Sequence, residues 1–328
     1  MKPIAVDVMG TDRGPAEIVA GARRASEQLG VAVLLVGRPD AMGDTGDLPV
    51  LAATEVIGMH DDAATAVRRK KDASVVRAAE AVRDGEASAM VSAGNTGAAM
   101  GSALLRMGRL PGVSRPAIAT PLPVPGATPT VLLDAGANAE CQAAWLVQFA
   151  QMGAAFATGR FGIEHPRVGL LSIGEEETKG SPMVKEAHAL LKVPERWTGS
   201  GGRFIGNVEG RDMLTDRVDV VVTDGFTGNV VLKTLEGAMS FMRRAVFGAL
   251  TASPDTAEVG AAAVPLLLPL VKEMDPESYG GALLLGVDGV CIVSHGSSSS
   301  QAVVNAVGVA ADMVRLGLVD RLRQALKA

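Results

Sequence analysis

The sequence predicts an α/β fold, with a largely parallel, doubly wound sheet covered by helices on both faces. Short apolar segments alternate with helical patterns along the whole chain. These segments are rich in β-branched residues and nearly continuous in hydrophobicity, which is typical of strands buried on both sides. Length alone allows one or two domains. Strand-like sequence resumes directly after the Pro- and Gly-rich stretch 121–129, so we interpret that stretch as a surface connection and residues 1–328 as one domain.

The expected elements follow in order along the chain. Strands are expected at residues 4–8, 31–36, 89–92, 130–134, 168–172, 203–206, 218–223 and 290–294. Helices are expected to begin near Pro15, Ala73, Asn95, Ala139, Pro182, Gly228 and Ser298. Residues 228–277 contain no convincing strand and are interrupted near Ser253-Pro254, which predicts two helices that leave the sheet as a hairpin.

Composition excludes several classes of function. A formal net charge of −5 and 3% aromatic residues argue against a nucleic-acid surface. The most apolar run, residues 261–271, is too short to cross a bilayer and contains Pro265 and Pro269, although peripheral membrane contact stays open. Two cysteines without C-x-x-C spacing indicate a reducing, cytoplasmic setting, and four scattered histidines predict no metal cluster. No cofactor is expected.

Six turns that follow expected strands combine glycine with polar groups. They are residues 8–15, 92–98, 134–138, 172–182, 223–229 and 295–300. Open α/β sheets bind ligands beyond the carboxyl ends of their strands, so we expect these turns to converge on one rim. Neither G-x-G-x-x-G after the first strand nor a P-loop is present, which weakens nucleotide binding, and G-x-S-x-G and H-E-x-x-H are also missing.

The turn Ser-Ala-Gly-Asn-Thr-Gly-Ala at residues 92–98 is the strongest of the six, because it joins an apolar strand to a helix. Its glycines let backbone N–H groups approach a ligand, the helix start adds partial positive charge, and Ser92, Asn95 and Thr96 add polar side chains. Phosphate is the expected guest.

Other residues at strand ends are weaker candidates. His295 opens a serine-rich turn and is suited to act as an acid, a base or an oxyanion donor, or only to order its loop. Lys179 and Lys185 are the best cationic candidates, although lysines are usually solvated. Asp7, Asp134 and Asp224 end strands and fit capping as well as catalysis. The basic run at residues 68–71 is a solvated face, a docking surface for an acidic carrier or a cluster that concentrates an anion.

Long strings of sequence resemble the bacterial phosphate acyltransferases of phospholipid synthesis, which depend on acyl-carrier protein. They include AVDVMGTD, VRRKKDASVV, SAGNTGA, LLDAGAN, RVGLLSIGEEETKG, DVVVTDGFTGNVVLKTLEG, YGGALLLG and HGSS, and the match runs from end to end. The resemblance implies a three-layer α/β/α sandwich similar to isocitrate and isopropylmalate dehydrogenases and to phosphotransacetylase. It also implies a homodimer with a projecting helical pair. Ser181 and Ser299 stand where the family often has Asn or Asp.

The resemblance implies that inorganic phosphate attacks the thioester of long-chain acyl-acyl-carrier protein, giving acyl phosphate for a membrane-bound glycerol-phosphate acyltransferase. Phosphate is itself a nucleophile, so the enzyme only positions it, stabilises the oxyanion and helps the thiolate leave. We expect Lys179, Lys185, His295 and Asn95 to be catalytic. Substrate contacts are expected from Asp7, Gly10, Ser92, Gly94, Thr96, Gly97, Asn138, Asp224, Asn229, Lys233, Ser297 and Ser298.

The helices after Gly228 are rich in apolar side chains, among them Met239, Met242 and Val246, and they are the expected wall of an acyl groove or a core or dimer contact. Two other functions stay open. One is phosphotransacetylase-like transfer of short acyl groups from acyl-coenzyme A. The other is a noncatalytic anion-binding or membrane scaffold.

Overall fold

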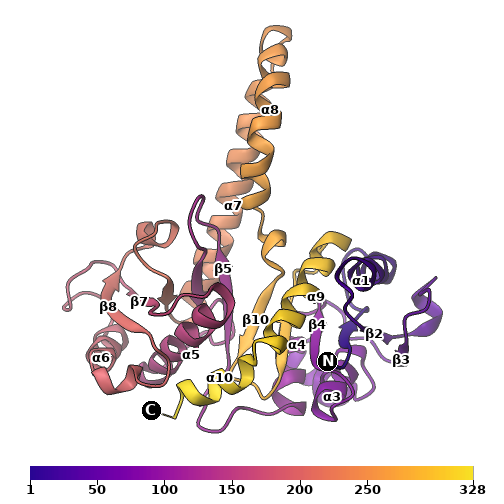
Figure 1. Ribbon diagram of the computed structural model, residues 1–328, viewed down its shortest axis with the longest axis horizontal. Coiled ribbons are helices and arrows are strands. Elements are labelled where there is room, and N and C mark those ends of the chain that lie inside the picture. The colour runs from indigo at the N-terminus through magenta and orange to yellow at the C-terminus, as the bar shows by residue number, and fades with distance from the viewer. Residues whose placement is uncertain (328) are drawn as a thin grey trace.

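A single eleven-stranded sheet runs through the body of the molecule in the computed structural model, which describes residues 1–327 (Figure 1). The strand order is β3-β2-β1-β4-β11-β10-β5-β6-β9-β7-β8. All eight expected strands are present, and their ends lie within two residues of the expected positions. The strands are β1 Ile4–Asp7, β2 Val33–Gly37, β3 Val50–Ala52, β4 Ala89–Ser92, β5 Ala117–Leu122, β6 Thr130–Leu133, β7 Arg167–Leu171, β8 Arg203–Val208, β9 Val220–Val222, β10 Ala282–Leu285 and β11 Val290–Val293.

Three strands were not expected, and two of them, β5 and β10, lie in the middle of the sheet. The connection expected at residues 121–129 is therefore wrong at its start, because Pro121 belongs to β5 and pairs with Val131. Proline lacks a backbone N–H and usually argues against a central strand, which explains the error. Both β5 and β10 run antiparallel to their two neighbours, whereas the other pairs in the sheet are parallel.

Helices cover both faces of the sheet and complete the three layers. The side chains of each strand alternate between two cores: Ile4 and Val6 belong to a core that includes residues of α1, α5, α9 and α10, while Ala5 belongs to a core that includes residues of α2, α3 and α4. The helices are α1 Pro15–Leu29, α2 Ala63–Arg69, α3 Ser74–Arg83, α4 Thr96–Arg106, α5 Ala143–Phe161, α6 Pro182–Leu191, α7 Gly225–Leu250, α8 Pro254–Glu273, α9 Ser300–Arg315 and α10 Leu318–Ala325.

The two halves of the sheet run in opposite directions. Strands β1, β2, β3, β4 and β11 are parallel to one another, and the antiparallel strands β10 and β5 reverse the direction before β6, β9, β7 and β8. The pairings across the middle of the sheet relate the last residue of β4, Ser92, to the last residue of β6, Leu133. They are Ser92 with Val293, Val293 with Ala282, Leu283 with Ala119, and Ala119 with Leu133. The strands of the two halves therefore approach from opposite directions and end within about one residue of the same height in the sheet.

This register corrects the expectation of one rim. The turns after β1, β4 and β11 belong to one half of the sheet, and those after β6, β7 and β9 belong to the other. They do not leave the sheet in the same direction. Turns from both halves nevertheless meet around β5 and β10, because the halves end at a common level.

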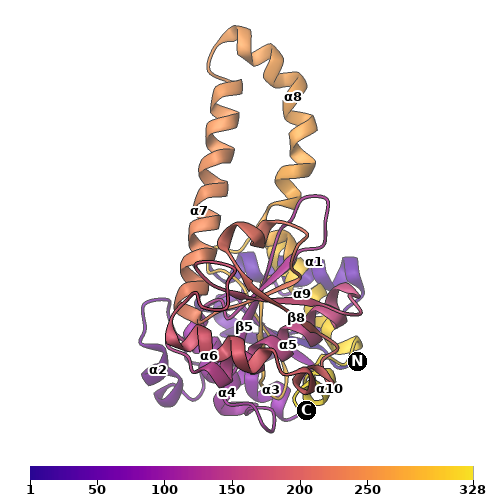
Figure 2. The same ribbon diagram turned by 90° about the vertical axis from the view of Figure 1, so that its left-hand side faces the viewer.

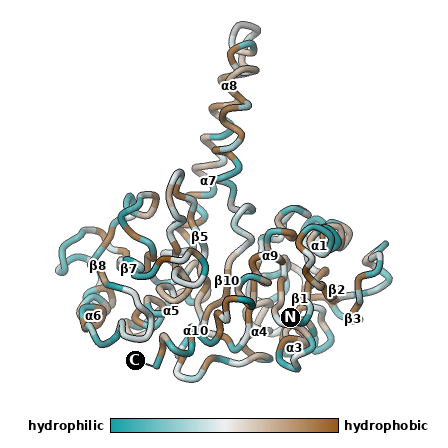
Figure 3. Tube along the Cα trace, in the orientation of Figure 1, coloured by the Kyte–Doolittle hydropathy of each residue, from teal (hydrophilic) through white to brown (hydrophobic). Residues whose placement is uncertain are grey.

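The helical hairpin, α7 and α8, projects far from the body, as expected for residues 228–277 (Figure 1). Figure 2 shows the two helices rising together and joined at their far end. Ser253 caps α8 by accepting a hydrogen bond from the N–H of Thr256, and Pro254 opens the helix, so the break falls at the expected dipeptide. Hydrophobic residues continue from the body into both helices (Figure 3), and Phe241 and Leu266 are 62% and 80% exposed.

Within the described residues, no single helix is long and apolar enough to cross a membrane. The bent pair formed by α9 and α10 is long and apolar enough to cross a membrane, judged by length and composition alone. Alanine and valine side chains along α9 are buried against the sheet.

Candidate active site

The turn after β4 is held by the side chain of Asn95. Its Oδ1 accepts a hydrogen bond from the N–H of Ala98 at 3.0 Å, which caps α4. Its Nδ2 donates to three carbonyl oxygens of a neighbouring loop, those of Gly58, Met59 and Asp61, at 3.3, 3.1 and 3.2 Å. Asn95 therefore fixes the helix start and the loop beside it, and its amide is used in doing so.

The first turn of α4 offers backbone donors. Its first internal hydrogen bond runs from Ala99 to the carbonyl of Asn95, and the N–H groups of Thr96 and Gly97 have no acceptor among the described residues. A Cβ on Gly97 would lie 2.8 Å from the Cβ of Ala63, so glycine lets α2 pack against this helix start. N–H groups without acceptors at a helix start are the donors that an anion site at this turn would use.

The buried carboxyl group of Asp7 holds this turn through Ser92. The Oγ of Ser92 donates to Asp7 Oδ2 at 2.7 Å, and the N–H of Gly94 donates to Ser92 Oγ at 3.3 Å. Burial raises the pKa of Asp7, although hydrogen bonds from Ser74, Ser92 and the N–H of Met9 act in the other direction. Asp7 and Ser92 are thus placed beneath the turn as its scaffold.

Gly10 brings the first turn against the same loop. Its φ of +72° lies in the left-handed region, and a Cβ there would lie 2.6 Å from the carbonyl oxygen of Ile57. The N–H of Asp12 donates to the carbonyl of Gly296 at 3.0 Å. The turns after β1, β4 and β11 therefore form one packed group.

The turns after β6 and β9 form a second packed group around Asp134. Asp224 caps α7 through the N–H and hydroxyl of Thr227, at 2.9 and 2.8 Å. Position 228 has room only for glycine, because a Cβ there would lie 1.9 Å from the carbonyl oxygen of Asp134. Burial raises the pKa of Asp134, whose carboxylate accepts hydrogen bonds from the N–H groups of Ile118, Gly136, Ala137 and Asn138 and from the side chain of Asn138.

A pocket of about 200 Å³ lies where the two groups meet, and we call it the central pocket. Its floor comes from β5 and β10, through Thr120 and Ala282 among others. Five of the expected site residues line it: Thr96, Asn229, Lys233, His295 and Ser298. Lys233 forms an ion pair with Glu236 at 2.9 Å, and Glu236 also lines the pocket.

The His295 ring presents a defined face. Its Nδ1 accepts a hydrogen bond from the N–H of Ser297 at 3.2 Å and lies 2.7 Å from the Ser297 hydroxyl. An Nδ1 that accepts from a backbone N–H carries no proton, so the hydrogen-bond network assigns the proton of the neutral ring to Nε2. Ser297 thus orients the ring, and Nε2 is the donor that His295 offers.

The turn after β7 stands apart from the central pocket. Lys179 and Lys185 are exposed, and neither lines that pocket. The turn packs instead on the neighbouring strand, where the side chain of Asn207 donates to the carbonyl of Glu176 at 2.9 Å. Ser181 caps α6 just as Ser299 caps α9, a role that Asn and Asp also fill, so these departures from the family pattern leave the capping intact.

Two hydroxyls in the central pocket were missed. The Oγ1 of Thr120 and the Oγ of Ser294 are buried and have no hydrogen-bond partner among the described residues. An unpaired buried hydroxyl carries a desolvation cost, which a ligand can relieve. The available signal was the single hydroxyl in the apolar segment Ala-Ile-Ala-Thr-Pro-Leu, and the serine directly before His295.

Within the described residues, no three His, Cys, Asp or Glu side chains lie close enough to hold a metal ion. Cys141 and Cys291 are not bonded to each other, and burial raises the pKa of the Cys141 thiol to about 11 and that of Cys291 to about 12. Thiols with such pKa values stay protonated at neutral pH and are poor nucleophiles.

Solved structures similar in fold are acyl-transfer enzymes and dehydrogenases. A phosphotransacetylase from Streptococcus pyogenes superposes with a TM-score of 0.61 and 15% identity, covering 100% of this chain and 95% of that one. A phosphotransacetylase from Staphylococcus aureus gives 0.60 and 15%, covering 95% and 94%. A 4-hydroxythreonine-4-phosphate dehydrogenase from Klebsiella pneumoniae gives 0.54 and 12%, covering 96% and 100%. At such identities the likeness shows the fold.

Sequence relatives are far closer. Residues 2–321 match a family described as fatty acid synthesis protein. The phosphate acyltransferase of Heliobacterium modesticaldum is 47% identical over 332 residues, which covers 98% of this chain and 96% of the relative. That of Elusimicrobium minutum is 48% identical over 331 residues, covering 98% and 95%. The chain therefore belongs to the phosphate acyltransferase family and is an acyltransferase.

Proposed function

We propose that this acyltransferase moves a long-chain acyl group from the thioester of acyl-carrier protein to inorganic phosphate. The observation that carries the proposal is the central pocket, where the start of α4 and His295 come from one half of the sheet and Asn229 and Lys233 from the other. Hydrogen-bond donors and a cationic side chain thus surround one cavity.

The reaction balances without an enzyme nucleophile. A phosphate oxygen attacks the thioester carbonyl carbon, a C–O bond forms, and the tetrahedral intermediate collapses as the C–S bond breaks. The products are acyl phosphate and a thiol, which takes up the proton released from phosphate. The protein supplies position and charge stabilisation, which agrees with a site made of backbone amides and polar side chains.

Roles for the residues follow from their places in the pocket and beside it. The N–H groups of Thr96 and Gly97 hold phosphate at the start of α4. Lys233 lines the pocket, so we assign charge neutralisation to it ahead of Lys179 and Lys185. His295 donates from Nε2 to the oxyanion or to the departing sulfur.

We also propose a cytoplasmic homodimer whose acyl phosphate passes to a membrane-bound glycerol-phosphate acyltransferase. The projecting hairpin supports this, because exposed apolar side chains such as Phe241 and Leu266 on a helical pair suit burial in an interface or at a membrane surface. The basic run on and after α2 suits an acidic carrier, since Arg68, Arg69 and Lys71 are exposed.

The test incubates the enzyme with phosphate and palmitoyl-acyl-carrier protein and traps acyl phosphate as a hydroxamate. We expect phosphate-dependent product, lost in His295→Ala and retained in His165→Ala, an exposed histidine outside the central pocket. No product from acyl-carrier protein but product from acetyl-coenzyme A would establish the phosphotransacetylase-like alternative. Phosphate binding without any turnover would establish the scaffold alternative.

A further inference from the structure

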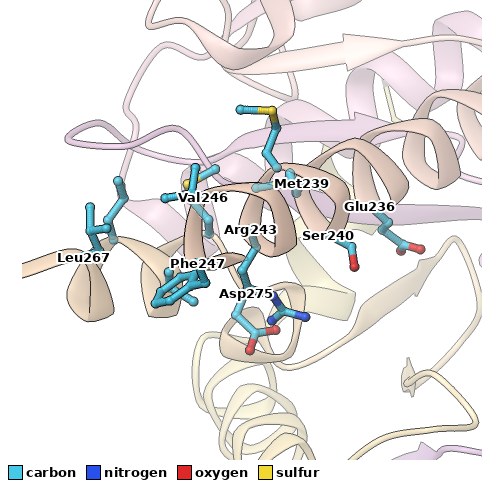
Figure 4. Close-up of a pocket in the computed structure, with 12 residues that line it drawn as sticks. Glu236, Met239, Ser240, Arg243, Val246, Phe247, Leu267 and Asp275 are labelled. Carbon is cyan, nitrogen blue, oxygen red and sulfur yellow. The ribbon is translucent and has the colours of Figure 1, made fainter. Parts of the chain in front are cut away.

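A second cavity of about 320 Å³ lies between the two helices of the hairpin, near their base, and we call it the hairpin cavity (Figure 4). One wall is a stripe of α7 whose members recur at helical spacing, and the other is a stripe of α8. The lining residues are mostly apolar: Met239, Met242, Val246 and Phe247 from α7, and Leu267, Leu270, Val271 and Met274 from α8 and its end.

The hairpin cavity adjoins the central pocket. Glu236 and Met239 line both, so the two hollows share a boundary on α7. Asn229 and Lys233 precede them on the same side of the helix, within the central pocket. At 1.5 Å per residue, the helix rises about 15 Å from Asn229 to Met239 and about 27 Å from Asn229 to Phe247. The polar site and the apolar hollow are therefore neighbours along one face of α7.

The side chains that line the hairpin cavity restrict the kind of ligand that it can bind. Its charged members, Glu236, Arg243 and Asp275, accompany a lining that otherwise consists of aliphatic, aromatic and thioether groups and one serine (Figure 4). Such a surface favours an unbranched hydrocarbon, and methionine side chains can adapt to chains of different length. A polar carrier arm would find few partners there.

We propose that the hairpin cavity holds the acyl chain of the donor, with the thioester in the central pocket and the methyl end toward Val246 and Phe247. This rests on the proposed function and adds that Met239 controls passage between the two hollows while Val246 limits chain length. Each buried methylene strengthens binding about fourfold, so the cavity favours long chains over short ones.

The experiment compares octanoyl and palmitoyl donors in wild-type enzyme and in Met239→Trp, Val246→Trp and Thr234→Trp. Thr234 is on the same helix but is exposed and lines neither hollow, so it is the matched control. If Val246→Trp excludes two methylenes, kcat/KM for the palmitoyl donor should fall roughly fifteenfold, with the octanoyl value within about twofold. Met239→Trp should lower the palmitoyl value at least as far, and the control should change neither.

A second readout needs no turnover. Displacement of a fluorescent fatty acid by palmitate measures occupancy of the cavity, and sedimentation velocity reports the oligomeric state of each variant. Unchanged octanoyl-to-palmitoyl ratios and unchanged palmitate binding in both cavity variants would overturn the proposal, as would a change confined to oligomeric state, which would assign the cavity to an interface. If wild-type enzyme uses neither donor, the proposed function fails, and palmitate binding lost in Val246→Trp would still support a hydrocarbon site.

Discussion

Substitutions of Asn95 can separate its contribution to stability from its contribution to phosphate binding. Its Oδ1 caps α4, a contact that contributes about 1 kcal/mol. Its two amide hydrogens serve three carbonyl oxygens, and hydrogen bonds of this kind contribute about 1 kcal/mol each. Asn95→Ala should therefore lower the free energy of unfolding by about 3 kcal/mol, and Asn95→Ser, which keeps a cap, by about 2 kcal/mol.

The same variants should weaken phosphate binding more than donor binding. When the neighbouring loop is released, the N–H groups of Thr96 and Gly97 lose their fixed direction, and the loss of one well-placed charge-assisted hydrogen bond raises KM for phosphate about tenfold. Asn95→Asp keeps the cap but turns an acceptor toward the carbonyl oxygens, so it should raise this KM despite an intact helix start.

Urea unfolding gives the stability series, and hydroxamate trapping at varied phosphate and donor concentrations gives both KM values. Ser181→Ala is the matched control, because it removes the cap of α6 outside the central pocket and should lower stability by about 1 kcal/mol without changing either KM. Equal stability of Asn95→Ser and wild type, together with an unchanged KM for phosphate, would refute the assigned role of the amide.

Three further predictions concern the scaffold and its charge. Burial raises the pKa of Asp7, so its ionisation above pH ~4 opposes folding; Asp7→Asn should be more stable than wild type in urea at pH 7, with the difference shrinking as pH falls through 4. Lys233→Ala should raise KM for phosphate about tenfold and Lys179→Ala less than about twofold, and the reverse order in the hydroxamate assay would place phosphate at the turn after β7. Gly228→Ala should cost about 3 kcal/mol in urea unfolding through its clash with a backbone carbonyl, whereas Gly237→Ala, with open space around it, should not destabilise α7.

Much of the fold was predictable because its signals are local. Continuous apolar runs revealed the parallel strands, and the Ser253-Pro254 break located the turn of the hairpin. The central antiparallel strands β5 and β10 were missed for local reasons as well: β5 contains Pro121, and β10 is short and follows the hairpin. Their positions in the sheet depend on pairing with strands that are distant in the sequence, and a local sequence pattern does not contain this information.

The candidate site was predictable to the same extent. The turn at residues 92–98 could be recognised, because its glycines and polar residues lie directly between a strand and a helix. The hydrogen-bond partners of Asn95 lie some 35 residues away in the chain, so its structural task could not be inferred. Thr120 was missed because its importance depends on burial and on the lack of a partner, both of which are tertiary properties.

The reversal of direction at β10 and β5 brings turns from opposite halves of the sheet to the central pocket. Thr96 and His295 belong to turns of the half that contains β1, β4 and β11. Asn229, Lys233 and Met239 belong to α7, which follows β9 in the other half and continues into the hairpin. Changes around α4 should therefore act chiefly on KM for phosphate, and changes along α7 beyond Lys233 on the acyl donor. A site on one rim of a uniformly parallel sheet would predict no such division.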